Sequence, residues 1–377
     1  MKVVIVLPYL KSLGGAGIYG WELAQFLSEQ GDNVIVAPLF SDKNLYQKND
    51  SIKLVDIVDE SFHPQKLKYW FQIRKIKSNL KKIVLSNNPD VVIFINWPTS
   101  MWATNFQNIP VVFSPLDIQI LYSDTYTRNL SPGMYWLWNI LRPFVRLYEK
   151  NQWKYFNKII TISKFVSEHV SKIYDVDSTI IYPGAKQVYF DTSSAKKEKS
   201  IFCLGDIKTR NASFLIECAY ELSKKRDDFK IWIAGNKNQH SEELKKLVKK
   251  YSLENIVTFF GKVSDEKLAS LYSQSSVFTH LVNEAPFGIQ VVESMATGTP
   301  VISWKPGGPE ETILDKETGF LIPSFNKKSL ILHIEKFLDN PDLVLKMGEK
   351  SKKRAIEYFQ NKNNYSKIRE LLLDSID

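Results

Sequence analysis

The sequence predicts an α/β protein built from two Rossmann-like domains, with parallel sheets that face an interdomain cleft. Three observations lead to this prediction. Short apolar runs rich in β-forming residues alternate with helix-like segments along the whole chain, which is typical of parallel sheets with crossover helices. The chain has 377 residues, 44% of them hydrophobic, which is enough for about two domains. A polar break at residues 191–200 separates two halves of similar size.

Each half supplies its own strand candidates, because short runs of apolar and β-branched residues are bounded by turn-forming residues. In the first half these runs are residues 2–7, 33–38, 53–58, 90–96, 110–114, 157–163 and 178–182. In the second half they are residues 200–205, 229–235, 256–261, 276–281, 299–303 and 319–322. Helical patterns fill the gaps, as where Leu23, Phe26 and Leu27 recur at helical spacing.

The domain boundaries follow from changes in composition. We expect a first domain at residues 1–184, a linker at 185–200 and a second domain at 201–355. Tyr182-Pro183-Gly184 ends the first half, and a new apolar strand begins at Ile201 after the polar stretch. Residues 356–377 are helical in pattern and strongly charged. We expect this last helix to pack back on the first domain.

Composition excludes several classes of protein. The charged fraction is 24% and the aromatic fraction 13%, so the chain is neither disordered nor collagen-like. No apolar run approaches the roughly 18–20 residues of a membrane helix, and the first residues lack the layout of a signal peptide. Cys203 and Cys218 form neither a disulfide framework nor a metal-binding pattern. These features predict a cytoplasmic protein.

The net charge of +9 is partly local. Basic residues between positions 62 and 85 alternate with apolar and aromatic residues at helical spacing, and the basic ones are Lys66, Lys68, Arg74, Lys75, Lys77, Lys81 and Lys82. Such a helix either lies on an anionic membrane surface or packs its apolar stripe on its own sheet. An aromatic-rich stretch at residues 121–155 likewise covers an acceptor, touches lipid or forms a helical core layer. No nucleic-acid recognition motif accompanies the charge, so we expect no nucleic-acid partner.

Glycines follow the first strand. Gly14-Gly15-Ala16-Gly17 comes between the strand at residues 2–7 and a helical pattern. Glycines at a strand-to-helix turn allow backbone amides to approach a phosphate or a sugar. The alternative is a tight turn without a ligand, because the spacing is not that of the dinucleotide fingerprint.

The densest motif lies in the second half. A loop with Glu284 and Phe287-Gly288 leads through Ile289 into a helix that carries Glu293. The start of a helix suits a diphosphate, and a carboxylate one turn further can accept hydrogen bonds from a ribose diol. Gly307-Gly308 follows the next strand and places backbone near the same ligand.

At these residues the chain resembles the retaining glycosyltransferases of family 4, also called group 1, which have the GT-B fold of two Rossmann-like domains. The resemblance covers nearly the whole chain. It rests on these motifs in this order: Gly14–Gly17, residues 162–166, Tyr182-Pro183-Gly184, Ile233-Ala234-Gly235, residues 257–265, Phe287-Gly288 to residue 302, and Gly307-Gly308 to residue 321.

The resemblance implies a sugar transfer with retention at the anomeric carbon. The second domain would bind a nucleotide-diphosphate sugar, and the first a saccharide or lipid-linked saccharide acceptor for polysaccharide or glycan biosynthesis. Basic side chains and a helix start would neutralise the diphosphate, so no metal and no cofactor is expected. A lipid-linked acceptor would place the enzyme peripherally at the inner face of the plasma membrane.

The resemblance also assigns residues. Glu284 would be catalytic. The residues expected to bind the nucleotide-sugar are Gly14, Gly15, Gly205, Lys208, Arg210, Phe287, Gly288, Ile289 and Glu293.

Two departures from the family pattern concern the sugar donor. The family usually has two glutamates eight positions apart, but Ala285 lies eight residues before Glu293, and Glu284 lies nine before it. The usual arginine after the first glycine of the second domain is replaced by Asp206, and the usual lysine falls near Asn211. Lys208 or Arg210 would then supply the missing positive charge.

A third departure concerns the acceptor side. Many members have a histidine after a strand of the first domain, and residues 111–117 contain none. We therefore expect acceptor contacts from residues at the ends of two strands, namely Asn96, Trp97, Ser114 and Asp117. His280, at a strand end of the second domain, is either structural or turned to the ligand. Asp117 is alternatively a cap, and Trp97 a packed loop residue.

These departures leave a second hypothesis open. The chain would keep the GT-B fold, lose the chemistry and act as a binding or scaffolding partner. Asp175-Val176-Asp177 matches the sequence pattern of a metal-binding pair of acidic residues, but we interpret it as a turn. A nicotinamide enzyme is disfavoured because the dinucleotide fingerprint is absent.

Overall fold

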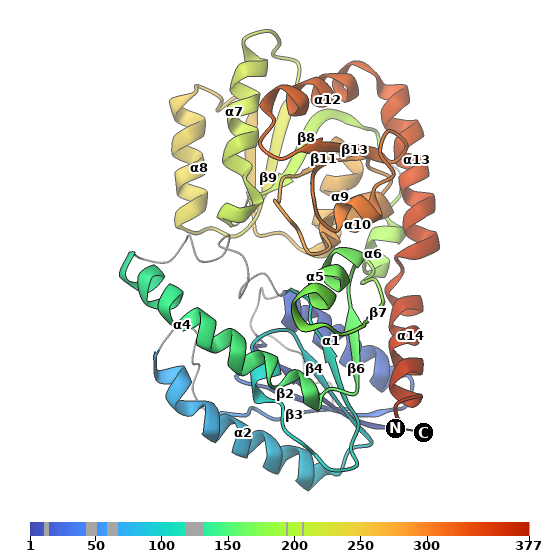
Figure 1. Cartoon of the computed structure of the whole chain (residues 1–377). Helices are drawn as coiled ribbons and strands as arrows, with labels where there is room; N and C mark the ends of the chain where they lie inside the picture. The colour runs from blue at the N-terminus through green and yellow to red at the C-terminus, as the bar shows by residue number, and fades with distance from the viewer. Residues whose placement is uncertain are drawn as a thin grey trace. The chain divides into compact units, whose positions relative to one another are not determined.

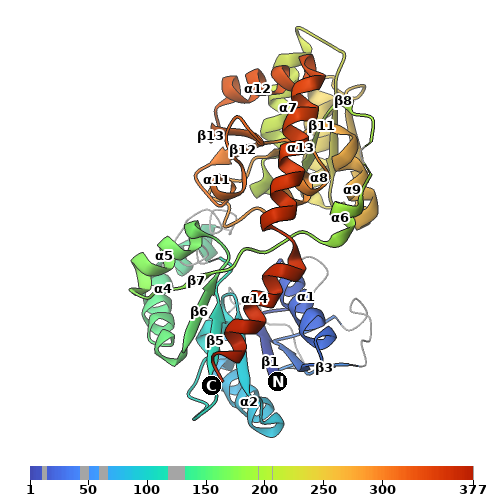
Figure 2. The same cartoon turned by 90° about the vertical axis from the view of Figure 1, so that its right-hand side faces the viewer.

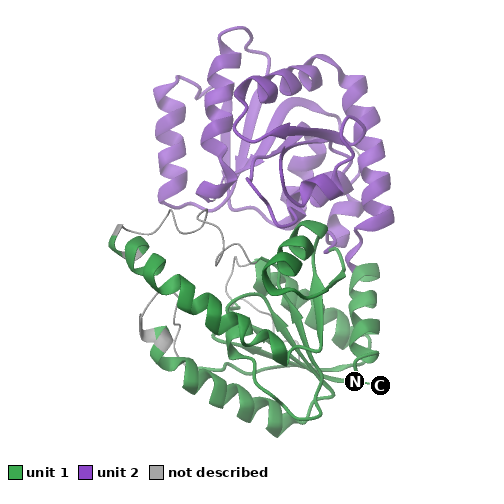
Figure 3. Cartoon of the chain, in the orientation of Figure 1, with its two compact units in different colours: residues 1–182, 362–377 green, residues 183–361 purple. Residues whose placement is uncertain are grey.

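The computed structural model describes residues 1–10, 15–42, 51–58, 67–117, 132–193, 195–205 and 207–376. The chain divides into two compact units (Figure 3). Unit 1 comprises residues 1–182 and 362–377, and unit 2 comprises residues 183–361. Gly14 and Asp206 lie outside the described residues, and so do residues 121–131 of the aromatic-rich stretch at 121–155.

Unit 1 contains a parallel sheet whose described strands have the order β3-β2-β1-β4-β5-β6-β7. The strands β1 and β4 at its centre are almost entirely buried, because helices cover both faces of a parallel sheet (Figure 1). The strands are β1 (Lys2–Leu7), β2 (Asn33–Pro38), β3 (Ile52–Leu54), β4 (Val91–Ile95), β5 (Val111–Ser114), β6 (Lys158–Thr161) and β7 (Thr179–Ile180).

The helices of unit 1 follow the strands in the order of a doubly wound fold. They are α1 (Gly15–Glu29), α2 (Leu67–Asn87), α4 (Pro132–Lys150), α5 (Lys164–Tyr174) and α14 (Asn361–Leu373), with short 3₁₀ turns η1 (Thr99–Trp102) and η3 (Trp153–Tyr155). Ser163 caps α5, because its side chain accepts a hydrogen bond from the Val166 amide at 3.0 Å.

Helix α14 comes from the end of the chain and packs beside α1 in unit 1 (Figure 2). Arg369 donates two hydrogen bonds to the buried Asp32 carboxylate, at 2.7 and 3.2 Å. Burial acts to raise the pKa of Asp32, but hydrogen bonds, first from Arg369, more than offset it and lower the pKa. Tyr365 donates to Glu22 Oε2 at 3.2 Å. These contacts attach the last helix to unit 1.

Unit 2 contains a second parallel sheet, with the order β10-β9-β8-β11-β12-β13 among the described strands. The order of β10 to β13 repeats that of the first six strands of unit 1, so both units have the Rossmann arrangement. The strands are β8 (Glu198–Leu204), β9 (Lys230–Ala234), β10 (Val257–Gly261), β11 (Ser275–His280), β12 (Val301–Lys305) and β13 (Gly319–Pro323).

The helices of unit 2 enclose a core of apolar side chains on both faces of this sheet, with Trp304 and Phe229 among the fully buried ones. They are α6 (Gln187–Asp191), α7 (Ala212–Ser223), α8 (Gln239–Lys250), α9 (Asp265–Gln274), α10 (Ile289–Ala296), α11 (Pro309–Thr312), α12 (Lys327–Asp339) and α13 (Pro341–Tyr358), with the 3₁₀ turn η4 (Lys208–Arg210).

The structure confirms the predicted fold class, since each strand candidate from the sequence corresponds to a strand of one of the two parallel sheets. The stretch 185–200, predicted as a linker, lies within unit 2 and includes α6, whose Tyr189 and Phe190 are buried. Cys203 and Cys218 are buried free thiols. No helix in the described part of the chain is long and apolar enough to cross a bilayer.

Candidate functional site

Glu293 lies on α10, beside the carboxyl edge of the unit 2 sheet. The fully buried Tyr272 of α9 donates a hydrogen bond to Glu293 Oε2 at 3.2 Å. Burial raises the pKa of Glu293 to about 7, although this hydrogen bond and the charge of Arg210 act in the opposite direction. Glu293 is therefore a positioned carboxyl group that changes its charge near neutral pH.

Helix α10 begins at Gly288, which has a φ of +84° in the left-handed region. No side chain of the described residues caps this helix start. The Val291 amide donates to the Gly288 carbonyl at 2.9 Å, so the Ile289 and Gln290 amides are the donors that this helix start offers to an anion. A Cβ atom at position 288 would lie 3.0 Å from His280 Nε2. Glycine is therefore required both by the backbone conformation and by the close approach of His280.

His280 ends β11 beneath the start of α10. Its side chain is buried, and its Nε2 has no hydrogen-bond partner among the described residues. Burial first, and the charge of Arg210 second, lower the pKa of His280 to about 3. The ring is therefore neutral at physiological pH and offers an unpaired nitrogen next to the helix start.

The structure separates the two basic residues between which the sequence left a choice. Lys208 is largely exposed, and its Nζ lies 3.4 Å from Glu243 Oε2 on α8. The charge of Arg210 instead acts on Glu293, His280 and Tyr272. Of the two residues, Arg210 is the cation whose charge reaches these three side chains.

Asn211 positions Arg210. Asn211 is the N-cap residue of α7 and has a φ of +50°. Its Nδ2 donates to the Leu281 carbonyl at 2.8 Å. This bond ties the 3₁₀ turn that carries Arg210 to the end of β11, where His280 lies. The structure thus brings the ends of β8 and β11 together, at the point where the strand order of the sheet reverses.

A cavity of about 310 Å³ lies at the ends of β8, β9 and β10, and β8 is the strand that precedes the turn with Arg210. Gly205, Gly235 and Gly261 end these three strands and line it, together with Lys237 and Lys245. A Cβ at Gly205 would lie 2.6 Å from a methyl carbon of Ile233. Neither lysine was a predicted site residue. The signal that could have found them was three predicted strands that each end in glycine.

The loop before α10 is supported by the turn after β12. Glu284 has a φ of +51°, and the buried Ala285 forms a parallel bridge with Gly307. The Gly308 amide donates to the Ala285 carbonyl at 2.8 Å. A Cβ at position 308 would lie 2.4 Å from the Phe287 Cα. The paired glycines therefore allow two backbones to touch at this loop.

Phe287 and Gly15 were both predicted to contact the donor, but they differ in packing. Phe287 is 2% exposed, and its ring lies 5.9 Å from that of Phe359, so it anchors the loop. Gly15 starts α1, and a Cβ there would meet no atom within 4 Å. Close approach in α1 occurs instead at Gly17 and Gly20, where a Cβ would meet Tyr9 O at 2.7 Å and Leu7 Cδ2 at 2.3 Å.

The four residues predicted for the acceptor side lie together at the carboxyl edge of the unit 1 sheet. Asn96 Oδ1 accepts from the Asp117 amide at 3.1 Å, and the Asn96 amide donates to the Ser114 carbonyl at 2.9 Å. Trp97 Nε1 and Ser114 Oγ are buried without a hydrogen-bond partner in the described ranges. The Tyr19 hydroxyl approaches that of Ser114 without reaching hydrogen-bond geometry.

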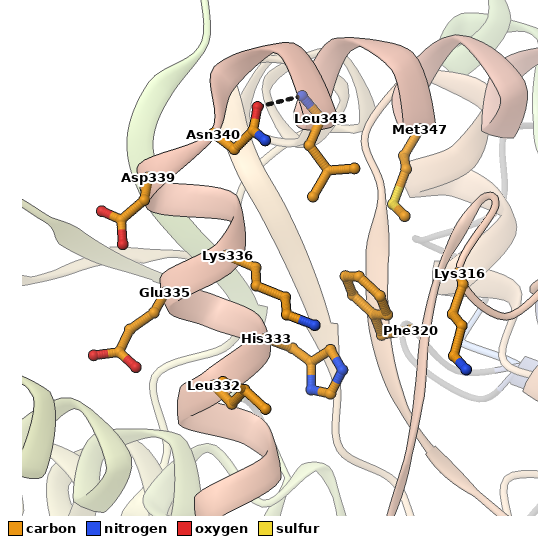
Figure 4. A pocket seen from close by; sticks show the side chains of 10 residues that line it. All are labelled: Lys316, Phe320, Leu332, His333, Glu335, Lys336, Asp339, Asn340, Leu343 and Met347. Carbon is orange, nitrogen blue, oxygen red and sulfur yellow. Dashed lines mark hydrogen bonds between the residues drawn. The ribbon is translucent and has the colours of Figure 1, made fainter.

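Unit 2 also has a larger cavity, of about 770 Å³, between α12, α13 and β13. Figure 4 shows Phe320 in this cavity, with His333 and Lys336 on one side and Lys316 on the other. The ring of His333 lies 4.3 Å from that of Phe320. None of the residues that line this cavity was predicted as a site residue.

Comparison with family models divides the chain near the same place as the two units. Residues 13–186 match the model described as Glycosyltransferase Family 4. Residues 186–354 match the model described as Glycosyl transferases group 1. The two matches together span almost the whole chain, in this order.

Individual proteins give the same result. An uncharacterized glycosyltransferase of Haemophilus influenzae is 21% identical over 360 residues, 95% of this chain and 96% of that protein. The mouse alpha-1,3/1,6-mannosyltransferase ALG2 is 36% identical over 121 residues, which is 32% of this chain and 29% of that protein. The crystal structure of Anabaena HepE in complex with UDP has a TM-score of 0.78 at 15% identity, covering 99% of this chain and all of that one.

Proposed function

The chain belongs to the group 1 glycosyltransferases with the GT-B fold, and we propose that it moves a sugar from a nucleotide-diphosphate sugar to a hydroxyl of a saccharide or lipid-linked saccharide. The anomeric configuration would be retained, and no metal would take part. The observation that carries this proposal is the convergence of Glu293, Arg210 and the α10 start at one edge of the unit 2 sheet.

We assign the nucleoside to Glu293 and the neighbouring cavity. A carboxylate held by Tyr272 has a second oxygen left to accept hydrogen bonds from the ribose hydroxyls. The cavity at Gly205, Gly235 and Gly261 is lined by backbone at three strand ends, so a flat base can approach it closely. HepE, which shares the fold, binds UDP.

We assign the diphosphate to Arg210 and the amides at the start of α10. Negative charge grows on this diphosphate as the bond to the sugar breaks, and fixed cations and amides stabilise that charge. The neutral His280 adds a ring nitrogen that can form a hydrogen bond but carries no charge. This assignment supports transfer without a metal, and addition of EDTA should leave the rate unchanged.

We assign the transferred sugar to Glu284 and the acceptor to unit 1. Glu284 lies in the loop before α10, and its backbone has a left-handed conformation. In the absence of an assigned nucleophile, retention fits attack from the face of the leaving diphosphate, which takes the acceptor proton. Asn96, Trp97, Ser114 and Asp117 cluster at the carboxyl edge of unit 1, where the unpaired Ser114 Oγ and Trp97 Nε1 suit a hydroxyl-rich ligand.

The test is calorimetric binding of UDP, GDP and dTDP to the wild-type protein and to Glu293→Ala. We expect one nucleotide to bind and the variant to bind it about 100-fold more weakly, because hydrogen bonds to a charged group are lost. Glu254→Ala, at an exposed glutamate of the same unit, is the matched control. Unchanged binding to Glu293→Ala would remove Glu293 from the site.

The second candidate function is a catalytically silent GT-B protein that acts as a binding or scaffolding partner. The observation that favours it is the buried Ala285 at the position of the first family glutamate. A transfer screen with the sugars of the nucleotide that binds separates the two candidates. Nucleotide binding without transfer or sugar release would support the silent protein, whereas transfer that is lost in Glu284→Gln would support the enzyme.

A further inference from the structure

Helix α4 exposes a row of large apolar side chains. Trp136, Ile140, Phe144 and Leu147 are 68%, 44%, 69% and 62% exposed. Their spacing of four, four and three residues places them on one side of the helix. Isolated exposed apolar residues are common, but a continuous row marks an interaction surface. We call these four residues the α4 ridge.

The opposite side of α4 is firmly packed, which fixes the direction of the ridge. Trp138 and Val145 are each 6% exposed, and Glu149 is 2% exposed. Glu149 accepts hydrogen bonds from Ser100 Oγ at 3.1 Å, from Trp153 Nε1 at 3.0 Å and from Tyr174. A helix held by this network cannot rotate to bury its ridge in the unit 1 core.

The exposed side of helix α2 is positively charged, whereas the α4 ridge is apolar. Arg74, Lys75, Lys81 and Lys82 are exposed on one side of α2. Phe71, which is 82% exposed, and Leu85, which is 52% exposed, lie on the same side. Helix α2 contains no acidic residue. Its outer surface therefore combines basic and apolar groups, as in helices that lie on membranes.

The two helices are neighbours, and Lys77 joins them. Its Nζ donates to Gln152 Oε1 at 2.7 Å and lies 5.3 Å from the centre of the Tyr148 ring on α4. Burial lowers the pKa of Lys77. Tyr148 follows Phe144 of the ridge by one helical turn, and the 3₁₀ turn η1 contacts both helices. Lys77 is thus a structural contact, and Arg74, Lys75, Lys81 and Lys82 form the outer surface. Lys66 and the side chain of Lys68, which belong to the same basic stretch of the sequence, lie outside the described part of the chain.

We propose that the α4 ridge and the exposed basic residues of α2 together bind an anionic lipid surface. The ridge would enter the boundary between head groups and acyl chains, with Trp136 at the interface. The lysines and Arg74 of α2 would meet the anionic head groups. Charge favours lipid over a second copy of this chain, because a two-fold dimer through this surface would bring two sets of cations together.

The test is flotation of the full chain with lipid vesicles. Vesicles of phosphatidylcholine alone are compared with vesicles that contain about 30% phosphatidylglycerol as the anionic lipid. We expect binding only to the anionic vesicles, and weaker binding in about 0.5 M salt. Trp136→Ser/Phe144→Ser should reduce the partition coefficient about tenfold or more, and Lys81→Glu/Lys82→Glu by a similar factor.

Matched variants in unit 2 control for general effects. Leu332→Ser/Leu345→Ser changes two leucines that are 51% and 58% exposed, and Lys246→Glu/Lys249→Glu changes two exposed lysines. Both should bind vesicles as the wild type does. Equal losses in the control and test variants, or no flotation of the wild type, would overturn the proposal. So would a dimer that the ridge variant abolishes in sedimentation velocity without any vesicle binding.

Vesicle binding can be measured independently of sugar transfer, because it needs neither the nucleotide nor the acceptor. None of the ridge or α2 residues belongs to the nucleotide site in unit 2. Nucleotide affinity measured on the same samples should be equal in all variants, and wild-type thermal unfolding of each variant shows that unit 1 is folded. Loss of vesicle binding with unchanged nucleotide binding supports the lipid surface, whatever the transfer assay reports.

Discussion

The two units have the same strand order through six strands, but the carboxyl edges of their sheets carry different chemistry. In unit 2 the edge holds Arg210, Glu293 and the neutral His280. In unit 1 the edge holds Asn96 and Ser114 beside Asp117, and none of the residues predicted for the acceptor there is a cation. In such folds the topology decides where a ligand binds, whereas the few side chains at the switch point decide which ligand it is.

Hydrogen bonding follows the same division. The Glu293 carboxylate is held by Tyr272, as a group must be if it is to meet a ligand in one orientation. The Ser114 hydroxyl is buried without such a bond among the described residues. We interpret unit 2 as preorganised for the charged nucleotide, and unit 1 as leaving polar atoms to be satisfied by a neutral, hydroxyl-rich acceptor.

The largest expected effect comes from the glycines near each edge. Gly308→Ala should destabilise the protein by about 1–3 kcal/mol, because its Cβ would meet backbone atoms of Phe287 at 2.4 Å. It should also weaken nucleotide binding by displacing the α10 start. Thermal and urea unfolding, with calorimetry, measure both effects.

Gly15→Ala is the matched substitution in unit 1. A Cβ there meets nothing within 4 Å, so stability should be equal or slightly higher, by up to about 1 kcal/mol. Equal destabilisation by Gly308→Ala and Gly15→Ala would show that the backbone contact at the α10 loop is not the cause.

The next effect separates the two basic residues after β8. Arg210→Ala should weaken nucleotide-diphosphate binding about 10- to 100-fold, because a charged contact to phosphate is lost. Lys208→Ala should change it less than about threefold, since Lys208 pairs with Glu243 away from the site. Calorimetry with the diphosphate and with the parent nucleoside measures the difference. Equal losses for the two variants would contradict the assignment of Arg210.

A pH titration tests the role of the Glu293 charge at the unit 2 edge. The pKa of Glu293 is raised to about 7, so the carboxylate to which we assign the ribose is lost as the pH falls through 7. Nucleotide affinity should fall about tenfold between about pH 8 and pH 6. In Glu293→Gln the affinity should be lower and nearly independent of pH over this range.

The same titration has the opposite sign for folding. A carboxyl whose pKa is raised in the folded state binds its proton more tightly there than in the unfolded chain. The contribution of Glu293 to stability is therefore greatest below its unfolded pKa and is lost as the pH rises through about 7. Glu293→Gln should be as stable as the wild type at low pH and more stable above pH 7, as urea unfolding at each pH would show.

The smallest effect compares two buried serines on equivalent strands. Ser303 of β12 donates to the carbonyls of His280 and Trp304, at 3.1 and 3.2 Å. Ser303→Ala should therefore cost about 0.5–1.5 kcal/mol. Ser114→Ala of β5 removes a hydroxyl without a described partner, so stability should be unchanged or rise.

Ser114→Ala should at the same time raise the KM for the acceptor, with an unchanged nucleotide Kd. The pair of measurements distinguishes a binding hydroxyl from a structural one. A loss of stability in Ser114→Ala as large as in Ser303→Ala would contradict the assignment of Ser114 to the acceptor.

Much of this architecture could be predicted from the sequence alone. The strands were predictable because buried parallel strands are short, mostly apolar runs bounded by turn residues, such as the predicted runs at residues 2–7 and 299–303. The placement of Glu293 one turn into a helix that starts after Phe287-Gly288 was predictable because glycine marks the start and helical spacing gives the rest. These are local properties, and local propensity decides them.

The tertiary structure decided which of several similar residues serve the site. Lys208 and Arg210 are equivalent cations in the sequence, but only packing against α8 directs Lys208 to Glu243 and leaves Arg210 near Glu293. Lys77 and Lys81 are likewise equivalent until Tyr148 and Gln152 enclose one of them. The pKa of Glu293 and the exposure of the α4 ridge also depend on neighbours far away in the sequence. Burial and charge depend on all surrounding atoms, and a linear pattern does not contain those distances.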